Sequence, residues 1–178
     1  FSLDRISKAG AKFDFEKAKW YNHEWIKNAS AEILLPVVKQ AFAEHGTVLN
    51  DDQYLKSIID LIKDRCNLLT DFVPQSIYFF VAPESYDLDA VKPKWTIEKA
   101  KFFEAYALEI VDGLTGAELE EKFKTLATAH NFKPGELMLP FRIMLVGGKF
   151  GPGVFDIAVA LGAVETIKRI HKAIIAFN

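Results

Sequence analysis

The chain has 178 residues, half of them hydrophobic and 13% aromatic, which excludes a disordered tail and allows one large domain or two small ones. A single cysteine, Cys66, excludes an internal disulfide and favours a reducing, cytoplasmic setting. The net charge of −2 argues against a general nucleic-acid binder. The charge is uneven, however, because residues 83–121 hold ten acidic against four basic residues, whereas residues 122–178 hold eight basic against three acidic ones. This asymmetry allows an anionic partner to bind one face.

Residues 1–82 are expected to form a first helical subdomain. A short helical turn and a loop at residues 9–12 come first. Four helices are then expected from the spacing of apolar residues, starting near residues 15, 30, 51 and 71. Asp14 and Ser30 are typical N-cap residues, and the third helix ends near Arg65.

Residues 83–95 are rich in proline and charge and lack periodicity, which predicts a loop or linker. Residues 96–178 are expected to form a second, C-terminal helical subdomain. One of its helices begins at Thr115 with Glu118 three residues later, the capping-box pattern, and Gly162 is expected to separate the last two helices. No segment alternates apolar and polar residues for long enough to predict a strand. We therefore expect an all-α fold of about nine or ten helices in two packed subdomains.

The least generic stretch is residues 133–156. An apolar run carries one cation, Arg142, and is followed by a glycine-rich turn and by a helix that restarts at Val154. An arginine in an apolar run is costly unless its guanidinium reaches a carboxylate, a phosphate or a base edge. Two interpretations stay open at this point. The stretch is either a structural joint whose arginine pairs with a core carboxylate, or a ligand site at a helix N-terminus.

No self-contained catalytic site is predicted. A phosphate-binding loop fails at Gly148-Lys149, because Phe150 replaces the required Ser or Thr. Cys66 has no local partner that would mark it as a nucleophile, and the four scattered histidines argue against a metal site. We expect no catalytic residue, no bound metal, no membrane span and no DNA partner. The chain begins at Phe1 within what reads as an element, so we expect a piece of a longer protein.

Two motif blocks resemble bacterial-type glutamyl-tRNA synthetases, a family of class I aminoacyl-tRNA synthetases. The first block follows the pattern F-D-x-E-K-x-x-W-x-N and is carried by Phe13-Asp14, Glu16-Lys17, Lys19-Trp20 and Asn22. The second block follows the family's C-terminus and is carried by Gly135-Glu136-Leu137-Met138, Pro140-Phe141-Arg142, Gly147, Gly151-Pro152-Gly153-Val154-Phe155 and Leu161-Gly162. The resemblance covers nearly the whole chain, with residues 82–95 least alike.

The resemblance implies an all-α anticodon-binding region that forms the C-terminal part of a glutamate–tRNA ligase and grips tRNA-Glu. The full ligase would join glutamate to tRNA with ATP and Mg²⁺ during translation, in the cytoplasm and as a monomer. Its nucleotide-binding fold would lie upstream, so the fragment itself is expected to be non-catalytic and to hold no cofactor. The triplet Ile6-Ser7-Lys8 is accordingly not the family's catalytic lysine loop.

The resemblance also implies the residues that meet the anticodon, which are Arg65, Arg142, Gly151, Pro152, Val154 and Phe155. Arg65 falls where the family reads the third anticodon base, as in members that discriminate tRNA-Glu from tRNA-Gln. Phe155 and Pro152 would supply stacking and apolar surface, and Lys149 is a candidate phosphate contact. The alternative is a helical protein-interaction scaffold without RNA binding, in which residues 137–155 pack against a partner chain.

Overall fold

The structure is a computed structural model that describes residues 14–178. These residues form nine α-helices and four short 3₁₀-helices, so the all-α prediction is confirmed for this part of the chain. The α-helices are α1 (Phe15–Asn28), α2 (Ala31–Glu44), α3 (Asp52–Ile62), α4 (Phe72–Ser76), α5 (Leu88–Val91), α6 (Ile97–Glu109), α7 (Gly116–Ala129), α8 (Pro134–Val146) and α9 (Val154–Phe177). The 3₁₀-helices are η2 (Lys63–Arg65), η3 (Leu69–Asp71), η4 (Ile77–Phe79) and η5 (Lys92–Lys94).

Local side-chain chemistry explains where most of these helices begin. The carboxylate of Asp14 accepts a hydrogen bond from the Lys17 backbone N–H and so caps α1. Thr115 and Glu118 form the predicted capping box at the start of α7. Ser30 occupies the N-cap position of α2 as predicted, but its side chain makes no hydrogen bond to the backbone of the first turn.

Two predicted spans differ in detail. The helix expected over residues 71–81 is divided into α4 and η4, and the loop expected over residues 83–95 contains α5 and η5. The carboxylate of Asp87 starts α5 by accepting a hydrogen bond from the Ala90 N–H. Gly162 divides α9 as expected, because its φ of 77° is not helical. The turn and loop predicted within residues 1–12 lie outside the described residues.

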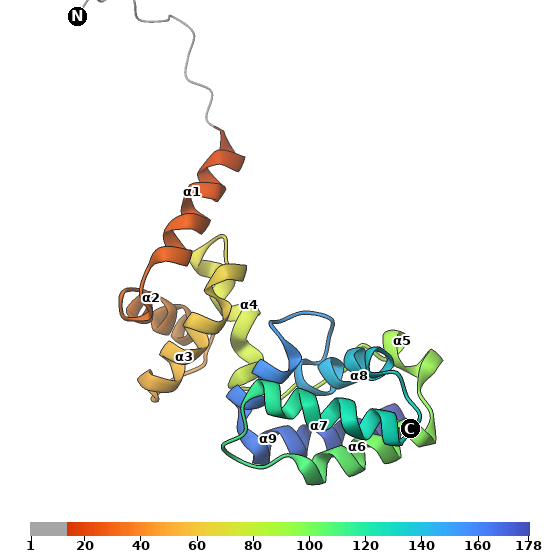
Figure 1. Cartoon of the computed structure of the whole chain (residues 1–178). Coiled ribbons are helices and arrows are strands. Elements are labelled where there is room, and N and C mark those ends of the chain that lie inside the picture. The colour runs from red at the N-terminus through yellow and green to blue at the C-terminus, as the bar shows by residue number, and fades with distance from the viewer. Residues whose placement is uncertain (1–13) are drawn as a thin grey trace, which may run out of the picture.

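The helices form two groups, α1–α4 and α5–α9, with α1 projecting away from the second group (Figure 1). The second group is centred on packed aromatic rings from α6, α7 and α8, among them Phe102, Phe123 and Phe141. The turn between α8 and α9 lies on the side that faces α4 and η4 (Figure 1). None of the described helices combines the length and apolar character that a membrane span needs.

Arg169 of α9 joins the two groups. It is only 2% exposed, and its Nη1 donates hydrogen bonds of 2.7 Å to the backbone oxygens of Tyr78 in η4 and Leu145 in α8. Its Nε donates to Glu165 one turn earlier, at 2.8 Å. A buried guanidinium with three acceptors fixes η4 against α8.

Candidate nucleic-acid interface

Arg142 is placed by α8 and holds the turn that follows. Its Nη1 donates hydrogen bonds to the backbone oxygens of Phe150, Gly151 and Pro152, at 3.0, 3.2 and 2.6 Å. Its Nε and Nη2 make no hydrogen bond within the part of the chain that the structure describes. One nitrogen therefore fixes the side chain, and the other N–H groups stay available for a ligand. The predicted joint between Arg142 and a core carboxylate is not found among residues 14–178.

Arg65 is the last residue of η2, and its side chain is exposed. The segment that follows it is held by α1, because His23 Nδ1 lies 2.9 Å from the Cys66 oxygen and the Asn22 amide donates to the Asn67 oxygen. Asn22 belongs to the first motif block, so this motif has a structural role in placing Arg65.

Arg65 and Arg142, here called the arginine pair, lie close enough for their charges to interact. Partial burial lowers the pKa of the Arg142 guanidinium, and the positive charge of Arg65 lowers it further. Neither guanidinium pairs with a carboxylate within residues 14–178. Two cations 77 positions apart in sequence, neither paired with a carboxylate among the described residues, thus lie within electrostatic reach of each other and of Tyr78. Such a site is suited to an anion or to electronegative base edges.

The glycine turn, residues 147–153, is shaped by close backbone approaches. Gly147 ends α8 with a φ of 83°, and a Cβ there would lie 2.8 Å from the Ser85 oxygen. Gly151 has a φ of 94°, and a Cβ there would lie 2.9 Å from the hydroxyl of Tyr78. Both positions therefore require glycine. Lys149 of the same turn is exposed and pairs with Asp87 at 3.2 Å, so a phosphate would have to compete with this carboxylate.

The side chains of Pro152, Val154 and Phe155 are buried, in contrast to the expectation that Phe155 and Pro152 offer surface to a base. Phe155 is 6% exposed, and its ring packs against the rings of Phe123 and Phe141. The centroid of the Phe155 ring lies 5.4 Å from that of Phe123 and 5.9 Å from that of Phe141. Its faces are used in the core because α9 must pack on α7 and α8. The exposed ring of the glycine turn is Phe150, which is 45% exposed.

Phe150, Tyr78 and Arg169 were missed by the sequence analysis. An aromatic residue between glycines was a usable signal for Phe150. Arg169 carried a weaker signal, a cation on the apolar face of the last helix. Tyr78 gave none, because its place beside the arginine pair depends on how η4 packs against the glycine turn.

The helix N-terminus of α9 is a poorer anion site than the sequence suggested. Gly153 provides no side-chain cap, but Asp156 lies in the first turn and its carboxylate approaches Gly153 closely. This negative charge already partly neutralises the positive end of the helix dipole. Any anion would therefore be attracted by the arginine pair rather than by the helix terminus.

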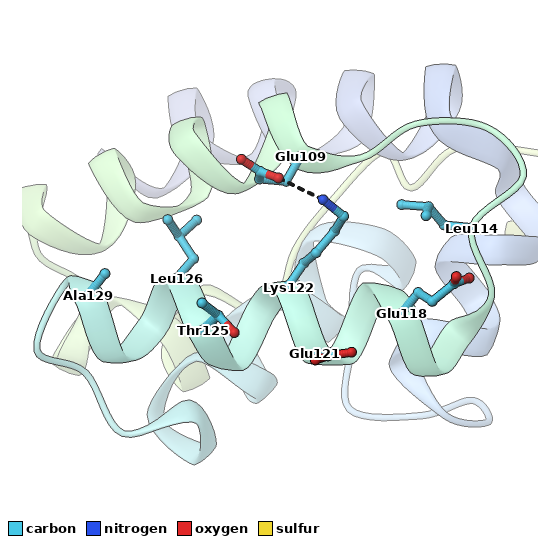
Figure 2. A pocket seen from close by; sticks show the side chains of 8 residues that line it. All are labelled: Glu109, Leu114, Glu118, Glu121, Lys122, Thr125, Leu126 and Ala129. Carbon is cyan, nitrogen blue, oxygen red and sulfur yellow. Dashed lines mark hydrogen bonds and ion pairs between the residues drawn. The ribbon is translucent and has the colours of Figure 1, made fainter.

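A groove of about 430 Å³ lies elsewhere, between α6 and α7. Figure 2 shows its lining, which includes Glu109, Glu118 and Glu121, with Lys122 bonded to Glu109 at 2.8 Å. None of the predicted site residues lines it. Its acidic character makes it unsuited to a phosphate backbone. Among the described residues, no three metal-ligating side chains gather in a group.

The family of anticodon binding domains matches residues 16–174. This chain belongs to the anticodon-binding-domain family. The resemblance drawn from the two motif blocks is thereby confirmed, and Arg65, Arg142 and the glycine turn all lie inside the matched span of the domain.

Similar proteins agree with this assignment. The anticodon-binding domain is 38% identical to a glutamate–tRNA ligase of Flavobacterium psychrophilum and 35% identical to one of Porphyromonas gingivalis, in each case over 98% of the chain. It superposes with a TM-score of 0.85 on a glutamate–tRNA ligase of Elizabethkingia meningosepticum, solved in complex with its amino acid, at 36% identity and over 100% of the chain. The chain spans 35–36% of the length of these proteins.

Proposed function

We propose that this domain binds the anticodon loop of tRNA-Glu as the C-terminal part of a glutamate–tRNA ligase. The observation that carries the proposal is the arginine pair, two guanidinium groups brought together without a carboxylate partner among the described residues. Two guanidinium groups with free donors attract a negatively charged or electron-rich ligand. Unstacked anticodon bases and their phosphates provide this chemistry.

The fixed orientation of the Arg142 guanidinium favours specific recognition of a base over general attraction between charges. Because Nη1 is held by three carbonyls, the plane of the guanidinium is fixed before RNA arrives. A fixed fork loses little entropy when it binds a base edge bidentately. Phe150, exposed beside it, supplies a ring on which a base can stack.

The remaining assigned residues act through backbone and shape. Pro152, Val154 and Phe155 are buried, so the turn can offer a base its backbone groups more readily than these side chains. Gly151 lets the backbone approach a ligand closely. Lys149 contacts a phosphate if it leaves Asp87, and Arg65 reads the third anticodon base.

Ligation is assigned to the rest of a longer, monomeric, cytoplasmic protein. Residues 14–178 contain no cluster of ligands suited to Mg²⁺, and the glycine turn departs from a nucleotide-phosphate loop at Phe150. We assign ATP and Mg²⁺ binding to the rest of that protein, and RNA recognition to this domain. The scaffold alternative loses its main support, because the apolar residues of α8 are buried within the domain itself.

The test is binding of unmodified tRNA-Glu transcript, compared with a transcript whose third anticodon base is changed, at two salt concentrations. We expect weaker binding of the changed transcript at both salts, because base contacts discriminate whereas phosphate contacts do not. Lys39→Ala serves as the control variant, because this lysine is partly exposed on α2, pairs with Asp52 and is not among the candidate site residues. It should discriminate between the two transcripts as the wild type does. Equal binding of both transcripts that fades with salt would contradict base reading.

A further inference from the structure

Tyr78 has a buried hydroxyl that no hydrogen bond explains. The residue is 3% exposed, and its Oη has no hydrogen-bond partner among the described residues. Its backbone oxygen, by contrast, accepts the 2.7 Å bond from Arg169, which fixes its place on η4. Buried hydroxyl groups are normally bonded, so an orphaned one calls for a reason.

The hydroxyl lies beneath the glycine turn and beside the arginine pair. The positive charges of Arg65 and Arg142 both act on the phenol, although burial raises its pKa well above the ordinary value and keeps it protonated. A Cβ on Gly151 would lie 2.9 Å from Oη, and the Phe150 ring lies 5.6 Å from the Tyr78 ring. The Tyr78 hydroxyl is therefore a neutral hydrogen-bond donor that lies directly under the surface on which the proposed ligand binds.

No group within residues 14–178 accepts a hydrogen bond from this donor. A phenylalanine would fill the same space without burying an unbonded polar atom, and removing such an atom is neutral or stabilising. The unbonded hydroxyl thus destabilises the free domain slightly, and this loss is offset only if the hydroxyl gains a hydrogen bond in another state, such as a ligand-bound one.

We propose that the Tyr78 hydroxyl donates a hydrogen bond to an acceptor atom of the anticodon nucleotide that the arginine pair binds. Because the Phe150 ring packs against Tyr78, this ring turns aside when RNA binds and exposes the hydroxyl, while the backbone oxygens of the glycine turn keep their bonds to Arg142. This inference rests on the proposed function and adds a specificity residue to it. Tyr78 contributes a neutral contact, in contrast to the charged contacts of Arg65 and Arg142.

The test is Tyr78→Phe, measured for melting temperature and for affinity to tRNA-Glu transcript at two salt concentrations. We expect an unchanged or higher melting temperature and an affinity about fivefold to tenfold weaker, the effect of one neutral hydrogen bond. The loss should be equal at both salts, because no charge is removed, whereas Lys149→Ala, at the candidate phosphate contact, should reduce the salt dependence.

Tyr86→Phe is the matched control. The Tyr86 hydroxyl is also buried and without a hydrogen-bond partner among the described residues, but neither Arg65 nor Arg142 acts on it. Its loss should leave RNA affinity unchanged.

Two results would overturn the inference while leaving the proposed function intact: Tyr78→Phe binding as tightly as wild type, or melting clearly lower than wild type. Failure of the wild-type domain to bind the transcript would overturn both.

Discussion

Arg142 and Arg169 lie on neighbouring helices and both donate to backbone carbonyls, yet their surroundings differ. Arg169 is fully buried, pairs with Glu165 and bonds two separate elements, whereas Arg142 is partly exposed, bonds one turn through one nitrogen and has no carboxylate among its described neighbours. A guanidinium whose donors are satisfied within the protein stabilises the fold. One with donors left over, beside a second unpaired arginine, is available to a ligand.

The largest expected effect is at Arg169. Replacing Arg169 by Ala leaves two buried carbonyls and Glu165 without their donor, so we expect the free energy of unfolding to fall by about 3–4 kcal/mol. Urea denaturation followed by circular dichroism measures this. The variant that folds at low temperature should still bind RNA, and a loss of RNA binding without a loss of stability would contradict the comparison.

Arg142→Ala should show the reverse pattern. Loss of the bonds to the glycine turn should lower stability by only about 1–2 kcal/mol, but affinity for tRNA-Glu should fall roughly 10- to 100-fold, the range for one bidentate base contact. Arg142→Lys keeps the charge and loses the planar fork. It should recover little of the affinity, and full recovery would mean that Arg142 acts as a charge alone.

Gly151→Ala tests the shape of the turn. The φ of 94° and the 2.9 Å approach to the Tyr78 hydroxyl should together lower stability by about 1–2 kcal/mol. Combining it with Tyr78→Phe removes the nearest atom and leaves Ile157 Cδ1 at 3.2 Å and the Tyr78 Cζ position at 3.4 Å. The double variant should therefore be more stable than Gly151→Ala alone, and a purely additive result in thermal melting would contradict the predicted contact.

The smallest effect near neutral pH concerns Cys66, which follows Arg65. Burial, with a smaller contribution from the charge of Asp71, raises the pKa of this thiol to about 12 from 9.0. A raised thiol pKa gives stability that is complete below pH 9 and is lost as the pH rises toward 12. Melting temperature should therefore fall above pH 9, and less so in Cys66→Ala. Rapid labelling of native Cys66 by a thiol reagent at pH 7 would contradict its protonated, buried state.

The helices could be predicted from sequence because their signals are local. The cap at Asp14, the Thr115–Glu118 box and the break at Gly162 each depend on a few neighbouring residues. The division of residues 71–81 into α4 and η4 could not be predicted, since it depends on how that segment packs. The boundaries of the two subdomains stay a prediction.

The residues of the candidate site stay a prediction, and only some of them could be named from sequence. The resemblance pointed to Arg65, Arg142 and the glycine turn. The burial of Phe155 could not be read from sequence, because an aromatic residue at a helix start packs inward or outward according to its tertiary neighbours. Tyr78 and Arg169 act through contacts to distant elements, which no spacing rule reveals.

The central claim is that the arginine pair reads anticodon bases, and a double-mutant cycle tests it most directly. Wild type and Arg65→Ala are each measured with tRNA-Glu transcript and with the transcript changed at the third anticodon base. We predict that Arg65→Ala weakens binding of the unchanged transcript much more than that of the changed one, so that discrimination is lost. Equal weakening of both transcripts would contradict the claim and leave Arg65 as a phosphate contact.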